Sequence, residues 1–512
     1  MYKIIIVSIF VLLLSCEVVK DDKKTTQSRP NLVIIYADDL GFGDVSSYGA
    51  TELQTPNIDR IAKEGIKFMN GYAASPTCTP SRYALLSGNY PFRKKNARVL
   101  PGNAPLILDI NRQTLPSMLH DAGYITAVVG KWHLGLGDEN LNWNKEISPG
   151  PLEIGFDYSY IMASTNDRVP SVYVENHHIV GLDPEDPIEV SYKENFTGEP
   201  TGKENPEMLK VHPSHGHDMS IHNGISRIGF MRGGKSALFT DENMGDDFLK
   251  VSKEFITKNK DKPFFLFHSL HQPHVPRIPH ARFVGKSGLG PRGDVIVEAD
   301  WDVGQLLDHI EKLGLTENTI VIFSSDNGPV LDDGYKDEAV IKNGKHTPSG
   351  TLRGGKYSLF DAGTHVPFIV SWKGHIEPGI SDALVSQMDL LASFAKFTGQ
   401  KNMTIDSQNV IDALLGKSSK GRKSLILGRN NGISIRQGDW ILIPPHKGPK
   451  STGTFTNIET GRDTIYQLYN VKDDIGQQHN LAAQMHEKVI ELKQEMNSIK
   501  NEGKIELANI IN

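Results

Sequence analysis

The stretch Asn31-Leu32-Val33-Ile34-Ile35-Tyr36 leads almost directly into Asp38-Asp39. An uninterrupted apolar run of this length predicts a strand that is buried on both faces, as in a parallel sheet. Ligand sites of open α/β sheets lie just outside the carboxyl ends of the strands, so the two carboxylates are well placed to hold a cation. Because Gly41 and Gly43 follow, the pair fits an ordinary strand-ending turn equally well.

A second strand with a similar ending lies far along the chain. Residues 319–325 form another strand-like run, which ends in Asp326-Asn327. If the two strands are parallel neighbours, the sheet brings both endings together. The all-oxygen set that results, with Asp38 and Asp39, suits a hard cation, and Ca²⁺ fits it better than Zn²⁺.

Helix-like and strand-like segments alternate from the first strand onward, which indicates an α/β fold with a mixed, mostly parallel sheet between helices. The predicted helices are 55–68, 246–258 and 294–313, and the further strands are 126–129, 263–267 and 368–371, the last buried strand. No internal repeat, coiled coil or transmembrane helix competes with this interpretation.

The composition changes near residues 415–423, which are rich in Gly, Ser, Lys and Arg and are predicted to be a linker. Alternating segments after it predict a short antiparallel sheet with strands at 424–427, 432–436, 440–443 and 464–469. A helix over 483–500 would pack on that sheet. We therefore expect a large domain over 30–419 and a smaller C-terminal α+β domain over 420–512.

The first residues of the chain read as an export signal. Lys3 precedes an apolar run over 4–14 that is too short to anchor the chain across a bilayer. The run ends in Leu13-Leu14-Ser15-Cys16, which resembles the lipobox of bacterial lipoproteins. We expect a signal peptide over 1–15, a polar tether over 16–29 and membrane attachment through a lipid on Cys16, in an exported protein that faces the periplasm or the outer-membrane surface. An ordinary signal peptide with a chance cysteine is the alternative.

Only two cysteines occur in the chain, Cys16 and Cys78. Export and acylation account for the first, so the second has no disulfide partner in the mature chain. A free thiol in an exported protein is open to oxidation. Its surroundings read Cys78-Thr79-Pro80-Ser81-Arg82, and a helix predicted over 82–86 would direct backbone N–H groups at an anion beside it. A loop cysteine beside a turn-forming proline is the alternative.

A second polar cluster follows the strand at 126–129. It reads Gly130-Lys131-Trp132-His133-Leu134-Gly135, and in extended geometry Lys131 and His133 point to one side together. A histidine at a strand end is more often a structural residue than a catalytic one, but the lysine two positions away makes the two interpretations about equal. Three histidines follow the strand at 263–267, namely His268, His271 and His274. A basic loop, Leu352-Arg353-Gly354-Gly355-Lys356, lies further along the chain.

Taken in order, these motifs resemble those of the formylglycine-dependent sulfatases, the type I or arylsulfatase-like group of the alkaline phosphatase superfamily. The match comprises C-x-P-S-R at Cys78, the G-K-W-H-L-G run, the basic loop that ends at Lys356 and a C-terminal signature within 467–482. The family pattern places its histidine directly before x-Pro, which selects His274. The likeness spans residues 30 to 485 and implies the fold of that superfamily and sulfuric ester hydrolysis.

The resemblance implies that a maturation enzyme oxidises Cys78 to formylglycine, whose hydrate attacks sulfur. A serine there would stay sulfated, since it has no second hydroxyl from which a carbonyl could re-form. The implied Ca²⁺ ligands are the oxygen on residue 78 and the side chains of Asp38, Asp39, Asp326 and Asn327.

The resemblance also assigns the charges and the proton transfers. Arg82, Lys131 and Lys356, together with the cation, would offset the charge on the sulfuryl oxygens. His274 would protonate the departing sugar alcohol, and His133 would accept a proton as the carbonyl re-forms.

Two loops carry the candidate substrate contacts, Ser164, Asp167 and Arg168 in the first and His217 in the second. They resemble loops of sulfatases that remove 6-O-sulfate from galactose or N-acetylgalactosamine. A carboxylate accepts and a guanidinium donates, so Asp167 and Arg168 could hold two hydroxyls of a sugar with an axial O4. The alternative for this pair is a surface salt bridge.

The histidines within 212–217 could bind zinc, but no cysteine or well-spaced third ligand accompanies them, and polar contacts to a sugar are preferred.

The formal net charge of −6 is small for this length and gives no sign of nucleic-acid binding.

We expect an exo-acting 6-O-sulfatase on galactose or N-acetylgalactosamine of a sulfated glycan, such as a glycosaminoglycan, mucin or algal polysaccharide. The alternatives are a phosphate or phosphonate ester hydrolase of the same superfamily, and a non-catalytic glycan-binding lipoprotein whose cysteine is never modified. One cation site rather than two favours sulfate over phosphate.

Overall fold

The structure is a computed structural model that describes residues 29–429 and 432–510, with side chains up to residue 502. The predicted signal peptide, Cys16 as the predicted site of the lipid, and all of the predicted tether except residue 29 lie outside the described residues. Every helix within the described ranges is too short or too polar to cross a membrane.

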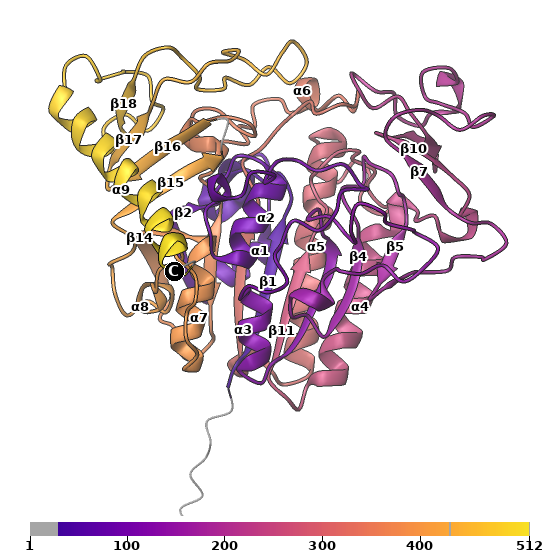
Figure 1. The fold of residues 1–512 in the computed structure, drawn as a ribbon, viewed down its shortest axis with the longest axis horizontal. Helices are drawn as coiled ribbons and strands as arrows, with labels where there is room; N and C mark the ends of the chain where they lie inside the picture. Colours follow the sequence, from indigo (N-terminus) through magenta and orange to yellow (C-terminus); the bar gives the residue numbers. More distant parts are fainter. Residues whose placement is uncertain (1–28, 430–431, 511–512) are drawn as a thin grey trace, which may run out of the picture.

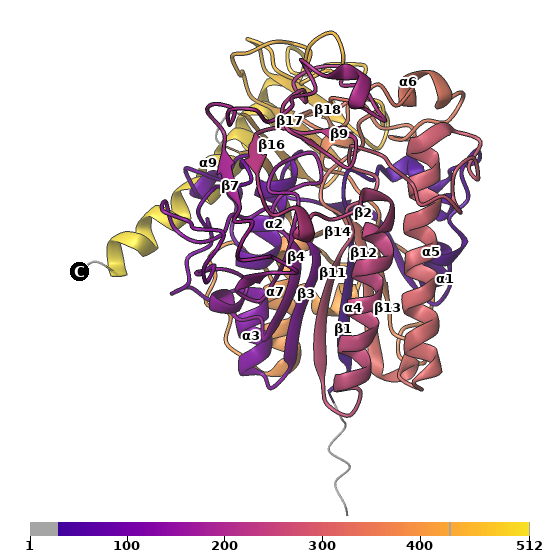
Figure 2. The same ribbon diagram turned by 90° about the vertical axis from the view of Figure 1, so that its right-hand side faces the viewer.

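A ten-stranded sheet forms the centre of the molecule (Figures 1 and 2). Its strands are, in spatial order, β14 (Gly379–Ser386), β2 (Gly65–Tyr72), β13 (Phe368–Ser371), β12 (Thr319–Ser325), β1 (Asn31–Ala37), β11 (Phe264–Ser269), β3 (Ile125–Lys131), β4 (Tyr158–Met162), β5 (Tyr173–Glu175) and β6 (His178–Ile179). Only β13 and β5 run antiparallel to their neighbours. The predicted mixed, mostly parallel sheet is confirmed.

Strand β1 occupies the middle of the sheet because all seven of its residues can be buried. It pairs in parallel with β12 on one side and with β11 on the other. Its one polar residue, Asn31, is satisfied by hydrogen bonds with the Thr319 hydroxyl at 3.3 Å and the Phe264 amide at 3.2 Å. The register sets Ala37 opposite Ser325, so the two aspartate-bearing strand ends are neighbours, as the sequence predicts.

Helices cover both faces of the sheet, as Figure 2 shows. One face carries α1 (Pro56–Lys63), α4 (Met244–Asn259) and α5 (Gly290–Lys312), and the other carries α2 (Cys78–Ser87), α3 (Leu115–Asp121) and α7 (Leu390–Thr398). The α4 and α5 helices confirm the predictions at 246–258 and 294–313, and both begin slightly earlier than expected.

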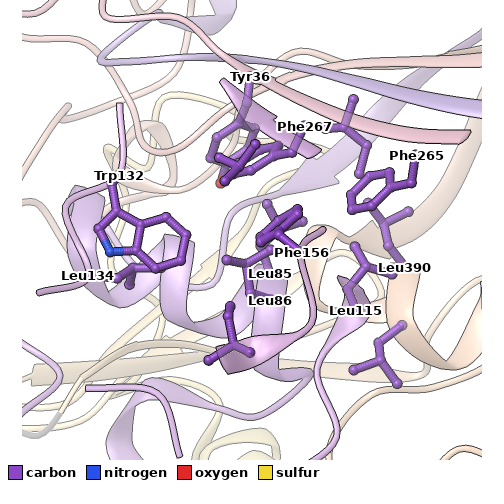
Figure 3. Packing of buried hydrophobic residues seen from close by; sticks show 14 of the residues in the cluster. Tyr36, Leu85, Leu86, Leu115, Trp132, Leu134, Phe156, Phe265, Phe267 and Leu390 are labelled. Atoms are coloured by element: carbon purple, nitrogen blue, oxygen red, sulfur yellow. The ribbon is translucent and has the colours of Figure 1, made fainter. Parts of the chain in front are cut away.

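Alternate residues of β1 feed the two hydrophobic cores. Ile34 and Tyr36 face the α2, α3 and α7 side, whereas Val33 and Ile35 face the α4 and α5 side. Figure 3 shows part of the first core, where aromatic rings of the sheet pack against Leu85 and Leu86 of α2. This packing fixes the position of α2, and with it the position of Cys78 at its first turn.

The predicted helix over 55–68 is wrong in its second half, because α1 ends at Lys63 and β2 begins at Gly65. Ile66 and Phe68 both enter the same core at a spacing of two residues, which is the period of a strand. The strand at 368–371 is also not the last buried one, because β14 follows and the second half of β14 is buried.

Between β4 and α4, two further pairs of short strands lie in addition to β5 and β6. These are β7 (Glu189–Ser191) paired with β10 (Phe230–Arg232), and β8 (Ile221–His222) paired with β9 (Ile225–Ser226). Two short helices occur later in the chain, α6 (Ala339–Lys342) and α8 (Ile411–Leu414).

A separate antiparallel sheet lies at the C-terminal end and confirms the smaller α+β unit. Its strands are β15 (Ser424–Arg429), β16 (Gly432–Gln437), β17 (Trp440–Ile443) and β18 (Gln467–Asn470). Helix α9 (His486–Ile510) packs on it through Leu492 and Met496. The predicted strand at 464–469 is displaced toward the C-terminus, and the boundary between 419 and 420 stays a prediction.

Candidate active site

The carboxyl ends of the parallel strands meet along one edge of the sheet, the upper edge in Figure 1. The loops that follow these strands enclose a narrow pocket of about 40 Å³. The residues that line it come from loops far apart in the sequence: Cys78, Val99, Asp167, Arg168, His217, His274, Asp333, Lys356 and Tyr357.

Cys78 is the first residue of α2 and is only 1% exposed. The helix predicted over 82–86 therefore begins at the cysteine itself, and the free N–H groups of its first turn lie beside residue 78. Burial raises the pKa of the Cys78 thiol above its ordinary value. The thiol consequently stays protonated near neutral pH and is a weak nucleophile in this form.

The four candidate cation ligands form one buried cluster, although 38 and 39 are far from 326 and 327 in the sequence. Asp326 Oδ1 accepts the Asp39 backbone N–H at 3.2 Å, and Asn327 Nδ2 donates to Asp39 Oδ1 at 2.7 Å. Asp38 is fully buried next to them. Asp39 adopts a left-handed backbone with φ of 67°, which turns the pair of aspartates toward this cluster.

Two oxygens of the cluster indicate that a cation belongs there. Asp38 Oδ1 and Asn327 Oδ1 are buried and have no hydrogen-bond partner among the described residues. An unpaired buried oxygen is costly unless it binds a cation. Among the His, Cys, Asp and Glu side chains of the described residues, the only three with ligand atoms within 4.8 Å of one another are Asp38, Asp39 and His274, and the histidines at 212–217 form no such group. The oxygens of Asp38, Asp39, Asp326 and Asn327 fit Ca²⁺.

Arg82 is directed at a carboxylate rather than at the pocket. Its Nε and Nη2 lie 2.9 and 2.8 Å from Asp326 Oδ2, and its Nη1 donates to the Ser269 hydroxyl at 2.6 Å. The guanidinium is completely buried and does not line the pocket. In this geometry Arg82 holds Asp326 in place, and its effect on a bound anion acts over a longer distance.

The two candidate lysines bind different carboxylates. Lys131 Nζ donates to Asp38 Oδ2 at 2.5 Å. Lys356 Nζ lies 2.8 Å from both Asp39 Oδ2 and Asp333 Oδ2, and only Lys356 lines the pocket. Burial opposes its charge, but Asp333 and Asp39 together raise the pKa of Lys356 well above its ordinary value. Lys356 is therefore a permanent cation at the pocket wall.

Asp333 and Tyr357 belong to the pocket but are not predicted from the sequence. The Tyr357 hydroxyl donates to Asp333 Oδ1 at 3.0 Å, and the Tyr357 backbone N–H donates to the Pro76 carbonyl at 2.8 Å. Tyr357 also has a φ of 73°, which is unusual for a bulky residue and typical of functional sites. The only local signal was the Asp-Asp-Gly run at 332–334, which indicates a turn as readily as a site.

The two ring nitrogens of His133 have different surroundings. Its Nε2–H donates to the Leu100 carbonyl at 3.0 Å, and its Nδ1 is buried without a partner among the described residues. Burial, reinforced by Lys131, lowers the pKa of His133 well below its ordinary value. The ring is therefore neutral, with the lone pair on Nδ1 available for a proton. Its backbone has a φ of 55°, a second unusual conformation near the site.

Among the three histidines after β11, only His274 lines the pocket. Its Nδ1 donates to the Val275 carbonyl at 2.6 Å, so Nε2 faces inward, 3.8 Å from Asp39 Oδ2. Burial, together with Lys356 and Lys131, lowers the pKa of His274 well below its ordinary value. His268 is structural, because it lies between the Ser252 hydroxyl at 2.8 Å and Asp302 at 3.0 Å.

The pair Asp167 and Arg168 is not a surface salt bridge, since Asp167 is 2% exposed and both residues line the pocket. Arg168 Nη1 donates to both carboxylate oxygens of Asp167, at 2.7 and 2.8 Å, and the Thr165 hydroxyl donates to the same group. Burial alone would raise the pKa of Asp167, but Arg168 and the hydrogen bond from His217 hold it well below its ordinary value.

His217 holds Asp167 in place, and both of its ring nitrogens are used in contacts within the protein. Its Nε2 lies 3.0 Å from Asp167 Oδ2 and its Nδ1 lies 2.8 Å from the His215 carbonyl, so both nitrogens face protein acceptors. Ser164 is buried with a hydroxyl that has no partner among the described residues, but it does not line the pocket.

Comparison with known proteins gives a consistent result. The family model described as "Sulfatase" matches residues 30–400. The chain is 48% identical to a curated N-acetylgalactosamine-6-O-sulfatase of Bacteroides thetaiotaomicron, over 94% of this chain and 95% of that protein. It is 29% identical to human arylsulfatase A, over 88% of this chain and 83% of that protein.

Solved structures give the same picture. One from a glycosaminoglycan-metabolising locus of Bacteroides thetaiotaomicron superimposes with a TM-score of 0.90 at 48% identity, covering 93% of this chain and 100% of that one. A sulfatase from Pseudoalteromonas superimposes with a TM-score of 0.70 at 22% identity, covering 93% and 91%, and shares the fold.

Proposed function

Because the chain belongs to the sulfatase family and is a sulfuric ester hydrolase, we propose that it is an exo-acting 6-O-sulfatase on galactose or N-acetylgalactosamine of sulfated glycans. The observation that carries the proposal is the pair of the buried Asp167 and the partly buried Arg168 in the same pocket as Cys78. The activity named for the 48% identical relative supports the same substrate class.

The proposed nucleophile is residue 78 after oxidation of its thiol to an aldehyde, the modification typical of the family. The hydrated aldehyde supplies one hydroxyl that bonds to sulfur as the ester S–O bond breaks, and a second hydroxyl whose deprotonation re-forms the carbonyl and expels sulfate. The buried, protonated thiol of the unmodified residue supports this proposal, because it offers neither group.

The proposed Ca²⁺ ligands are the oxygen on residue 78 and the side chains of Asp38, Asp39, Asp326 and Asn327. When bound, the ion supplies positive charge beside the sulfuryl oxygens. Lys356 adds a fixed positive charge at the pocket wall, and Lys131 adds another behind Asp38. Arg82 keeps Asp326 turned toward the cluster.

Two histidines are proposed to move protons. His133 accepts a proton at Nδ1, the nitrogen that its bond to the Leu100 carbonyl leaves free. His274 presents Nε2 to the pocket. Because Nδ1 keeps its proton on the Val275 carbonyl, the ring must be doubly protonated before Nε2 delivers a proton to the departing sugar alcohol, and the negative charge of a bound sulfate ester favours that form.

The sugar preference is proposed to come from Arg168 and Asp167. Nη1 of Arg168 is bonded to Asp167 and Thr165, which leaves Nε and Nη2 without a partner among the described residues. These donors suit an axial O4 hydroxyl, whereas an equatorial hydroxyl would leave the buried guanidinium without its contact. Such a loss corresponds to roughly tenfold to hundredfold discrimination.

The test compares initial rates on 6-sulfated N-acetylgalactosamine and 6-sulfated N-acetylglucosamine for the wild type, Asp167→Ala and Asp183→Ala. Asp183 is an exposed aspartate of the same region and serves as the matched control. We expect the wild type and the control to prefer the galacto sugar and Asp167→Ala to lose the preference. Equal wild-type rates on the two sugars contradict the proposed sugar preference. A separate measurement, the mass of the peptide that contains Cys78, shows whether that residue is an aldehyde.

We also propose that the protein is exported as a lipoprotein with a lipid on Cys16 and that a formylglycine-generating enzyme matures Cys78. The sequence at 3–16 supports the first proposal, and the lone cysteine in the family motif supports the second.

A further inference from the structure

Three neighbouring aromatic rings connect the pocket with the β17–β18 loop of the C-terminal sheet. His217 lines the pocket, and its ring lies 6.1 Å from the ring of His215, nearly perpendicular at 88°. The ring of His215 in turn stacks on Phe455, with centroids 5.1 Å apart and planes at 10°. We propose that His215 and Phe455 form a subsite for the sugar ring next to the sulfated one, an inference that rests on the proposed action on glycans.

The orientation of His215 is fixed by its neighbours. The Ser214 hydroxyl donates its proton to Asp332 Oδ1 at 2.6 Å, so the Ser214 oxygen must accept from His215 Nδ1–H at 3.0 Å. This network assigns the tautomer and leaves Nε2 as an acceptor that has no partner among the described residues. The side chain is 38% exposed, so a sugar hydroxyl can reach that nitrogen.

Phe455 is placed by a loop that runs over the upper edge of the molecule in Figure 1, between β17 and β18. The loop is held in shape by hydrogen bonds from Asn457 N to the Gly453 carbonyl at 3.0 Å and from Thr452 N to the Ile458 carbonyl at 2.9 Å. Phe455 is 52% exposed and is the only exposed phenylalanine of the described residues. An exposed apolar ring indicates a binding surface where further apolar side chains adjoin it.

A mostly apolar hollow of about 330 Å³ lies beside Phe455. Val330 and Leu331 line this hollow, whereas Asp333 lines the pocket, so one short segment of chain separates the two spaces. A sugar ring has an apolar C–H face and polar edges, and an aromatic face beside a hydrogen-bond acceptor matches both. The occupant that fits is therefore a second sugar of the same glycan, in line with the sulfated residue.

The test measures kcat/KM on a 6-sulfated monosaccharide and on an oligosaccharide that ends in the same sulfated sugar. We expect the wild type to prefer the oligosaccharide, and Phe455→Ala to lower the ratio of the two kcat/KM values about 2- to 12-fold, the factor that an aromatic contact represents. His215→Gln is a second variant, which keeps a polar side chain but loses the ring, and it should lower the ratio in the same direction.

The matched control is Ile465→Ala, another exposed apolar residue of the β17–β18 loop, at 57% exposure, which does not line the hollow. It should leave the ratio unchanged. The inference is overturned if the wild type shows no preference for the oligosaccharide, or if Phe455→Ala affects both substrates equally or neither. A wild type that hydrolyses no sulfated sugar would instead contradict the proposed function, so the two failures are distinguishable.

Discussion

Asp333 orients the ammonium group of Lys356 through a direct contact. The ammonium group of Lys356 lies at 2.8 Å from both Asp39 and Asp333. When Asp39 binds the cation, Asp333 is the carboxylate that remains to orient Lys356, and the Tyr357 hydroxyl keeps that carboxylate in place at 3.0 Å. In the proposed mechanism, Asp333 is therefore a positioning residue for the ammonium group that would face the transferring sulfuryl group.

We expect Asp333→Asn to lower kcat about 10- to 100-fold, the usual effect of removing a side chain that orients a functional group. KM should change little, because the charge of Lys356 matters most as the ester bond breaks. Tyr357→Phe should give a smaller loss in the same direction, and Asp183→Asn should give none. Steady-state kinetics on the monosaccharide measure this, and a change confined to KM would show instead that Asp333 binds the sugar.

Sequence patterns find the residues that stand directly at strand ends, and they miss those whose role depends on a distant partner. Asp38 and Asp326 are predictable because each follows a buried run that can only be a central strand. Asp332 and Asp333 are adjacent in one turn, yet the first bonds Ser214 and the second bonds Lys356. No local pattern distinguishes the two, because their partners come from other loops.

The two sheets are joined by a buried arginine on β16. Arg436 Nη2 donates to Asn70 Oδ1 at 2.7 Å, and the guanidinium lies 5.1 Å from the ring of Tyr72. The Tyr72 hydroxyl donates to Asp361 at 2.8 Å, and Asp361 lies 3.8 Å from Arg436 Nη1. Because Tyr72 ends the strand that leads to Cys78, this contact also supports the loop that carries the nucleophile.

We expect Arg436→Met to lower the free energy of unfolding by about 3 kcal/mol, because it leaves the buried carboxylate of Asp361 without part of its compensation. The matched control is Arg232→Met, which breaks an exposed pair with Glu189 and should cost about 0–1 kcal/mol. Chemical denaturation of both variants measures the difference. Equal losses would show that the buried contact adds nothing to the junction of the sheets.

The element that the sequence does not predict, β2, shows why local periodicity has limits. A side chain at Gly65 would meet the Val370 carbonyl at 2.2 Å, and one at Gly71 would meet the Phe368 side chain at 2.3 Å. These glycines permit close pairing with β13, a strand roughly three hundred positions away. The spacing of the apolar residues between them fits a helix on its own, and tertiary pairing decides for the strand.

At the scale of the whole molecule, the cluster at the sheet edge links metal binding to stability. Asp38, Asp39 and Asp326 converge from two strands that belong to distant parts of the chain. A cation held among them should therefore stabilise the folded protein, by about 2.7 kcal/mol at a concentration 100 times Kd.

Thermal unfolding scans after treatment with a chelator test this expectation. We expect added Ca²⁺ to raise the unfolding temperature and to restore activity, and Asp38→Asn to abolish both effects. Mg²⁺ should act more weakly, because it demands a stricter octahedral geometry. Restoration by Zn²⁺ and not by Ca²⁺ would contradict the oxygen-rich assignment.

The burial of Cys78 has a consequence for how the protein is made. Its sulfur lies beneath a pocket of about 40 Å³, in a helix turn that is packed against the sheet, and a second protein cannot reach it there. An enzyme that oxidises this thiol must act while the polypeptide is still open, before the segments that carry Asp326 and Lys356 close over it. Under the proposed maturation, oxidation of Cys78 and folding therefore compete in time, and a molecule that folds too early would keep its thiol and stay inactive for as long as it remains folded.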